Sequence, residues 1–406
     1  MRINHFFGGI LLISGTTIGA GMLALPVMTS FVGFFPSILI FSTCWLFMLL
    51  SAYFFLDVNL TFKEEANFIS MVQKTIGNWG KILSWIIYLL LLYSLTAAYI
   101  AASAPLFASA IESLTGYQLP DFLAWLSLPI LFGGFVYLGT LGVDLMNRLL
   151  MVGLCFSFVL LVGFLPSHID PQLLTHIDFS PTLIAIPVVI TSFGYHIIIP
   201  SLTTYMNHDR KKLRLALLLG SLIPLLIYIL WEVVILGIVP LEGKYSLVGA
   251  WKGGISATSP LVHIVNNKWI RIGANFFSFF AIVTSFLGVT LSLSDFLTDG
   301  LKIKKSWEGR LFAWMLTFIP PILFVFTYER GFIIALEYAG AFVAILLIFF
   351  PALMAWHLKT SKYYQSFKGR ILLLAVMLFA ILVVVTDVAA QGGYLKPLIS
   401  KYLNNV

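Results

Sequence analysis

The stretch GTTIGAGM at residues 15–22, followed by Pro26, decides the fold of this chain. It places Gly15, Gly19 and Gly21 near the middle of the apolar run 6–29. Each glycine costs up to about 1 kcal/mol relative to alanine in a helix, and lipid offers no water to the backbone groups that a break exposes. Irregular backbone at this depth is tolerated only beside protein or a water-filled cavity. The stretch therefore predicts a membrane helix that is broken near its middle.

A second weak point lies in the apolar run 182–203, where TSFGYH occupies residues 191–196 between two prolines. The two runs are five helices apart, so they cross the membrane in opposite directions. Paired helices that Gly or Pro interrupts at corresponding positions point to the midplane site of a transporter with an inverted repeat. For the first stretch alone, the alternative is close helix packing through Gly15 and Gly19. A dinucleotide fingerprint is excluded by the glycine spacing, and the second break favours the functional interpretation.

The composition is that of a membrane protein. The 406 residues are 60% hydrophobic and 10% charged, with a mean hydropathy of +0.99. Soluble domains carry charge on about a quarter of their residues, so a soluble catalytic domain is excluded. Cys44 and Cys155 both lie in apolar runs, which excludes a disulfide framework and a cysteine metal cluster, and we expect no cofactor. A signal peptide is the alternative for the opening segment, but ten further apolar runs follow it.

Eleven apolar runs predict an all-α protein with eleven transmembrane helices. They cover residues 6–29, 33–58, 81–113, 122–141, 146–165, 182–203, 213–239, 270–298, 309–327, 331–356 and 370–391. Each is longer than the roughly nine to eleven residues of a tilted barrel strand and shows no in-out alternation. We expect one domain over 1–406, with repeat one at about 6–165, repeat two at about 182–356 and an extra helix at about 370–391. The longest gap, 240–269, is predicted to be an outer loop.

The basic residues indicate how the chain is oriented. The net charge of +7 comes from Lys and Arg in short gaps, where they set orientation and imply no nucleic-acid partner. With the N-terminus inside, seven of the 24 basic residues are outside and the other 17 inside. The seven are Lys244, Lys252, Lys268, Arg271, Arg330, Lys396 and Lys401. The positive-inside rule therefore predicts a cytoplasmic N-terminus and an outer C-terminus.

Three motifs occur in an order that resembles a known family. They are GTTIGAGMLALP at 15–26, TSFGYHIIIPS at 191–201 and SFLGVTLSLSDFLTD at 285–299. They resemble the first, sixth and eighth helices of the bacterial hydroxy and aromatic amino acid permeases, most of all the tyrosine-specific members. The resemblance implies the five-plus-five inverted repeat of the leucine-transporter type, in the amino acid-polyamine-organocation superfamily, with discontinuous helices 1 and 6 and an extra eleventh helix.

The same resemblance implies a symporter in the bacterial inner membrane that imports an aromatic amino acid, first of all tyrosine, with protons. Tryptophan, other neutral amino acids and sodium coupling stay open. The side-chain pocket also stays open, because Tyr195 stands where Phe is often expected. A passive channel should show a continuous polar lining, and a membrane enzyme needs a nucleophile–base pair or metal ligands such as HExxH, which the sequence lacks. We therefore expect a transporter and no enzyme.

The two breaks supply the candidate substrate site. The substrate carboxylate is expected to meet backbone N–H groups of the first break, where glycine allows close approach, with hydroxyls added by two threonines. These residues are Thr16, Thr17, Gly19, Ala20 and Gly21. The ammonium is expected to face carbonyls near Ser192, Phe193 and Gly194. Phe193 and Tyr195 are candidates for an aromatic pocket, or else ordinary packing residues.

Coupling needs a group whose protonation or ion binding differs between the two access states. His196 is the most central titratable residue, although a lone buried His is more often a packing residue, and Glu232 lies deeper than the other acids. Those other acids, close to span ends, are Asp57, Asp295, Glu337 and Asp387. For sodium, the candidate hydroxyls are Thr284 and Ser285, with carbonyls of the first span. The third span adds Tyr93, Ser94, Thr96 and Tyr99, which face the central path or bond neighbouring helices.

Overall fold

The computed structural model describes residues 5–62, 67–138, 140–304, 306–328, 330–358 and 361–403, and every regular element within them is a helix. Ten helices are long and apolar enough to cross a membrane, and one bent pair brings the number to eleven. This confirms the predicted all-α class and the eleven spans. The predicted inner residues Arg2, Lys63, Lys305 and Lys359 lie outside the described residues.

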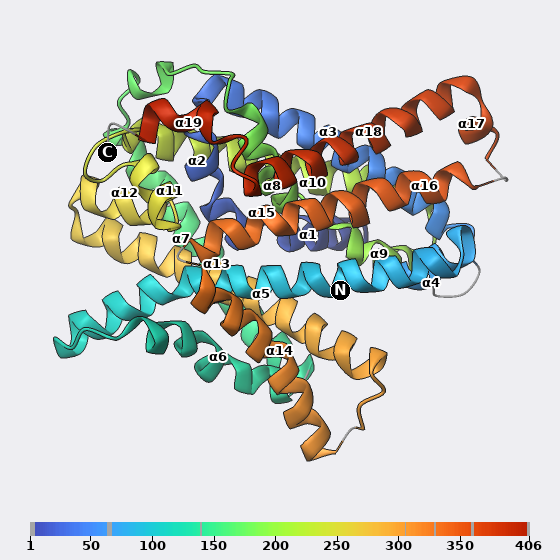
Figure 1. The fold of residues 1–406 in the computed structure, drawn as a ribbon, viewed down its shortest axis with the longest axis horizontal. Helices are drawn as coiled ribbons and strands as arrows, with labels where there is room; N and C mark the ends of the chain where they lie inside the picture. The colour runs from blue at the N-terminus through green and yellow to red at the C-terminus, as the bar shows by residue number, and fades with distance from the viewer. Residues whose placement is uncertain are drawn as a thin grey trace.

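The continuous spans coincide with the predicted apolar runs. They are α3 (Phe34–Asn59), α5 (Asn78–Thr115), α6 (Asp121–Leu138), α7 (Thr140–Phe164), α10 (Arg210–Ile238), α13 (Lys268–Gly300), α14 (Trp307–Thr327) and α18 (Phe367–Gln391). The tenth span consists of α15 (Gly331–Val343), the π-helical turn η5 (Ala344–Phe349) and α16 (Phe350–Trp356). In Figure 1, α5, α15, α16 and α18 run along the long axis of the molecule.

The first span is broken where the glycines predict it. α1 (His5–Thr17) ends before residues 18–19, and the short helices η1 (Ala20–Leu23) and α2 (Leu25–Thr29) follow at a bend of 46°. Gly19 is extended, with φ −167° and ψ −157°, so its amide leaves the helical ladder, while its carbonyl accepts from the Met22 amide of η1 at 3.2 Å. Pro26 stands in the first turn of α2, where its missing N–H has no intrahelical partner to lose.

The sixth span is interrupted with a smaller change of direction. α8 (Thr182–Ser192) ends before residues 193–195, and η4 (His196–Ile198) and α9 (Ile199–Tyr205) continue it. The whole still forms one 24-residue candidate span, Thr182–Tyr205. The two interrupted spans are therefore unequal, because only the first is sharply bent.

Short helices lie at both ends of the bundle, and the prediction missed them. They are α4 (Phe68–Ile76) and α17 (Lys362–Gln365) at one end, and α11 (Leu247–Gly253), α12 (Thr258–Val265) and α19 (Lys396–Leu403) at the other (Figure 1). The gap 240–269 therefore contains two helices. Ser246 caps α11 by accepting a hydrogen bond from the Gly249 amide at 3.0 Å.

Each end also carries a charged cluster. At one end, Asp57 of α3 accepts hydrogen bonds from Arg210 (3.0 Å) and Arg214 (2.6 Å) of α10 and from the Tyr364 hydroxyl (2.6 Å). We call this the Asp57 end. Asp57 therefore serves as an ion-pair partner rather than as a merely solvated acid.

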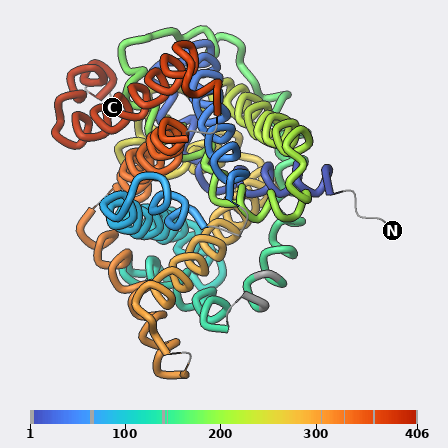
Figure 2. Tube along the Cα trace, turned by 90° about the vertical axis from the view of Figure 1, so that its right-hand side faces the viewer, coloured from blue at the N-terminus to red at the C-terminus, as the bar shows by residue number. Residues whose placement is uncertain are grey.

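At the opposite end, α19 folds back onto the bundle. Asp178 contacts Lys401 and accepts a hydrogen bond from the Tyr402 hydroxyl, both at 2.8 Å, and we call this the Asp178 end. The ring of Tyr402 packs on Phe31, which follows α2, with centroids 5.7 Å apart. Figure 2, viewed from the Asp57 end, shows α18 in red and α10 in yellow-green on opposite sides of the bundle.

Candidate substrate site

The two breaks meet at one cavity of about 510 Å³. Nine of the predicted site residues line it: Thr16, Thr17, Gly19, Ala20, Gly21, Ser192, Gly194, Thr284 and Ser285. α5 adds Tyr88 and Tyr99, and α7 adds Asn147 and Met151. Two segments about 170 residues apart in the sequence therefore share one wall, as an inverted repeat requires.

The cavity extends toward the Asp57 end. Its lining includes Leu11 and Leu12 near the middle of α1, Tyr88 on the first half of α5 and Ser292 on the second half of α13. Toward the Asp178 end, the backbone closes over the break, because the amide before α12, that of Ala257, donates to the Leu23 carbonyl at 3.0 Å. The lining therefore extends from the two breaks in the direction of the Asp57 end.

The backbone of the first break presents amide donors beside this cavity. The Ala20 amide donates to Ser285 Oγ at 3.0 Å, so the α13 hydroxyl caps it. The amides of Gly19 and Gly21 have no acceptor among the described residues. A Cβ on Gly19 would lie 2.5 Å from Ser285 Oγ, and one on Gly21 would lie 2.8 Å from Ser192 Oγ. Glycine is required here by close packing, and it leaves two amides for an anion.

The threonine hydroxyls are less available than predicted. Thr16 Oγ1 donates to the Leu12 carbonyl and Thr17 Oγ1 to the Ile13 carbonyl, both at 2.7 Å. Each hydroxyl has one proton, so neither has another to donate to a carboxylate. Both residues line the cavity, and their hydroxyl protons are engaged within α1 in this structure.

A tyrosine that the sequence did not single out joins the two breaks. The hydroxyl of Tyr228, on α10, lies 2.7 Å from the Thr17 carbonyl and 2.8 Å from the Ser192 carbonyl, and it donates its proton to this pair. Thr17 is the last residue of α1 and Ser192 the last residue of α8. No local sequence pattern marks Tyr228, because both contacts depend on the tertiary fold.

The aromatic residues of the second break point away from the cavity. Phe193 is fully buried and packs edge-on against Tyr228, with ring centroids 5.2 Å apart. Tyr195 is also fully buried, next to the His196 ring, and its hydroxyl has no partner among the described residues. Neither lines the cavity, where the tyrosine rings are those of Tyr88 and Tyr99. The structure therefore places Phe193 and Tyr195 outside the lining, and the aromatic residues of the cavity wall lie on α5.

The predicted proton-coupling residues are fully buried and do not line the cavity. His196 Nε2 lies 2.8 Å from Ser51 Oγ of α3, and its Nδ1 has no partner within the described residues. Glu232 shares a hydrogen bond with the Thr29 hydroxyl at the end of α2, and its second oxygen has no partner there either. His196, in the second part of the sixth span, therefore contacts α3. Glu232, on α10, contacts α2, the second part of the first span.

The predicted sodium ligands, both on α13, have different partners. Thr284 Oγ1 donates to the Phe280 carbonyl at 2.8 Å, and Ser285 Oγ accepts from Ala20. Of the third-span residues, Tyr99 lines the cavity, whereas Tyr93 donates to the Leu316 carbonyl of α14 at 2.9 Å. Ser285 therefore serves the first break as an acceptor.

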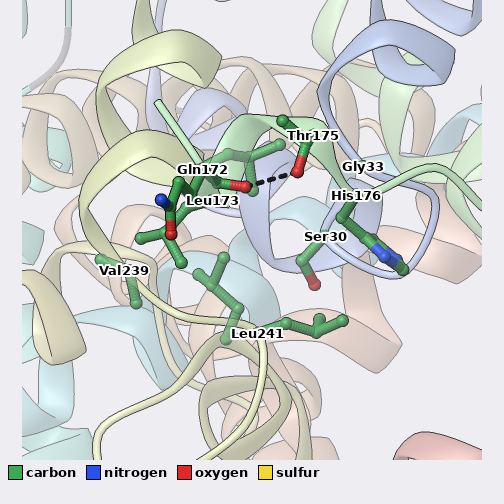
Figure 3. Close-up of a pocket in the computed structure, with 10 residues that line it drawn as sticks. Ser30, Gly33, Gln172, Leu173, Thr175, His176, Val239 and Leu241 are labelled. Atoms are coloured by element: carbon green, nitrogen blue, oxygen red, sulfur yellow. Dashed lines mark hydrogen bonds between the residues drawn. The ribbon is translucent and has the colours of Figure 1, made fainter. Parts of the chain in front are cut away.

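A second cavity, of about 350 Å³, lies near the Asp178 end (Figure 3). Ser30, Gly33, His176, Val239 and Leu241 are among its lining residues. None of the lining residues belongs to residues 15–22 or 191–196, so this cavity is separate from the helix breaks.

Known proteins that resemble this chain are membrane permeases. The profile of the tryptophan/tyrosine permease family matches residues 2–387. The chain belongs to this family. This family member is 31% identical to the Tyrosine-specific transport system 1 of Haemophilus influenzae, over 97% of its own length and 99% of that protein. It is equally 31% identical to the Tryptophan-specific transport protein of Pseudomonas aeruginosa, over 97% of each chain.

Among solved structures, this permease family member is similar to a manganese transporter from Eremococcus coleocola. The TM-score is 0.60 at 13% identity, over 98% of this chain and 91% of that chain. At this identity the similarity concerns the fold alone, and it confirms the predicted fold class. The family assignment makes the chain a multi-pass membrane permease rather than an enzyme.

Proposed function

We propose that this permease is a secondary active transporter that imports an aromatic amino acid, tyrosine in the first place, with protons and by alternating access. The observation that carries the proposal is the meeting of the two helix breaks at one cavity. Its volume of about 510 Å³ lies within the range of roughly 300–1,000 Å³ usual for small-molecule sites. The relatives named for tyrosine and for tryptophan support an aromatic cargo.

In this proposal the amides of Gly19 and Gly21 bind the substrate carboxylate. The carbonyls of Phe193 and Gly194 accept hydrogen bonds from the ammonium, because the Ser192 carbonyl is already engaged by Tyr228. The aromatic ring packs on the α5 face, where Tyr88 and Tyr99 alternate with leucines. Edge-to-face contact there adds roughly 0.5–1.5 kcal/mol beyond the burial of area.

Proton coupling is assigned to the two buried groups that contact the broken spans. A fully buried charge is costly unless it is paired, and both His196 and Glu232 have a polar atom without a partner in the described part of the chain. Movement of either broken span would change the solvation of these groups, so proton uptake would follow the access state. Sodium coupling through Thr284 and Ser285 is the alternative.

The positive-inside rule makes the Asp57 end cytoplasmic, in the inner membrane of a bacterium. In that orientation the N-terminus is cytoplasmic and the C-terminus is outside. The cavity extends from the breaks toward this end, so in this proposal the cargo leaves along it into the cell.

Uptake into proteoliposomes tests the proposal. Labelled tyrosine, tryptophan and phenylalanine are supplied under an imposed pH gradient or an imposed sodium gradient, each with and without an ionophore. We expect tyrosine to accumulate above its outside concentration only under the pH gradient. Equilibration without accumulation would indicate a passive channel, and accumulation under sodium alone would replace the proton assignment.

A further inference from the structure

Tyr228 occupies a position where the backbone offers only acceptors. The last carbonyls of a helix have no intrahelical donor and form the negative end of its dipole. Here two such ends face each other, since Thr17 ends α1 and Ser192 ends α8. Within the described residues the Tyr228 hydroxyl is the only hydrogen-bond donor to either carbonyl. One hydroxyl proton therefore serves two converging half-helices.

A cation is the other group that suits such a position. Half-helix C-termini and unwound carbonyls coordinate monovalent cations in transporters with broken helices. The Tyr228 oxygen lies 2.7 and 2.8 Å from the two carbonyl oxygens, so it fills the space between them. The tyrosine is fully buried and is held by Phe193 at a centroid distance of 5.2 Å. It is thus a buried donor whose ring is held in place by packing.

We infer that the Tyr228 hydroxyl takes the place of a bound cation between the two breaks, so that this point of the permease binds its substrate without sodium. Tyr228 is a positioning residue: it holds the Thr17 and Ser192 carbonyls at one separation and so fixes the adjoining amides of the first break. The inference takes the identity of the cargo from the proposed function, on which it rests to that extent. The replacement of a cation by the hydroxyl does not depend on that function.

Tyr228→Phe is the variant that tests this inference. It removes one oxygen and keeps the ring that packs on Phe193. Tyr93→Phe is the matched control, because it removes a phenol hydroxyl that donates to the single Leu316 carbonyl, outside the cavity. Both purified variants and the wild type are heated in 100 mM NaCl and in 100 mM choline chloride without substrate.

We expect sodium to raise the melting temperature of Tyr228→Phe alone, by at least about 2 °C. In tyrosine uptake at fixed pH gradient, we expect the KM of Tyr228→Phe to rise at least tenfold in choline and to recover partly in sodium, with kcat changed less. Wild type and Tyr93→Phe should be indifferent to sodium in both assays.

Two results would overturn the inference. One is a Tyr228→Phe protein that binds substrate like the wild type and ignores sodium. The other is a variant that loses affinity, with sodium neither restoring the affinity nor raising the melting temperature. That result would mean that the hydroxyl is needed for structure alone. If the wild type transports no aromatic amino acid, the proposed function fails, yet the melting experiment still decides the role of Tyr228.

Discussion

The contact between Gly19 and Ser285 allows one effect to be worked out in full. In Gly19→Ala the new Cβ would lie 2.5 Å from Ser285 Oγ but 3.8 Å from Ser285 Cβ, so the hydroxyl alone must move. Rotating it away breaks its 3.0 Å hydrogen bond with the Ala20 amide. An unsatisfied buried amide costs about 1–3 kcal/mol. We therefore expect Gly19→Ala to lower the free energy of unfolding by about 1–3 kcal/mol.

A double-mutant cycle separates this mechanism from general damage. Ser285→Ala alone removes the same hydrogen bond, and in the double variant the added Cβ meets only a methyl group. We therefore expect Gly19→Ala with Ser285→Ala to be as stable as Ser285→Ala and no less stable. The assay is the free energy of unfolding of the purified proteins, and Gly134→Ala is the control because an added Cβ there meets nothing within 4 Å. Losses that add within about 0.5 kcal/mol would refute the shared-contact explanation.

Three further predictions concern charged groups. His196→Ala should flatten the pH dependence of uptake and Glu232→Gln should shift it, both measured in proteoliposomes; two unchanged profiles would remove both residues from coupling. Burial alone raises the pKa of the Asp178 carboxyl, but hydrogen bonds led by that from Lys401 hold it well below its usual value. A lowered folded pKa stabilises the protein above the unfolded value of about 3.9, and this contribution is lost as the pH falls through the folded pKa. Asp178→Asn should therefore lower the melting temperature at pH 7, and its difference from the wild type should shrink progressively below about pH 3.9. A difference in melting temperature that stays the same in acid would contradict this prediction. Asp57→Asn should lower the free energy of unfolding by about 1–3 kcal/mol, because it weakens the contacts to two α10 arginines, and a melting temperature equal to wild type would refute the role of that cluster.

The membrane spans and the two breaks could be predicted because their causes are local. Apolar runs fix the spans, and glycine and proline mark where a helix ends, as at Gly19 and Gly194. The short helices at the ends of the bundle were missed because hydropathy does not detect them. Their capping residues carried a usable signal, since Asn67 and Ser246 each accept a hydrogen bond from the first turn of the short helix that follows, α4 and α11.

The contacts that complete the site could not be predicted, because they join distant segments. Ser285 lies 265 positions from Ala20, and Tyr228 lies 211 positions from Thr17. Asp57 was expected to be a solvated acid near a span end, and its arginine partner Arg210 is 153 positions away. A single sequence gives the type of a residue and its depth, but the face that it turns to its neighbours follows from how the helices pack.

The contacts of α10 bear on how the carrier would change its access. This helix bonds α1 through Ser14 Oγ and the Gly220 carbonyl at 2.9 Å, both broken spans through Tyr228, and α2 through Glu232. α13, in contrast, reaches the first break through the single Ser285 hydrogen bond. We therefore expect α10 to move together with the two broken spans when the access state changes, while α13 keeps its position. Spin labels on α1 and α10 would keep their spacing through the cycle, and labels on α10 and α13 would not.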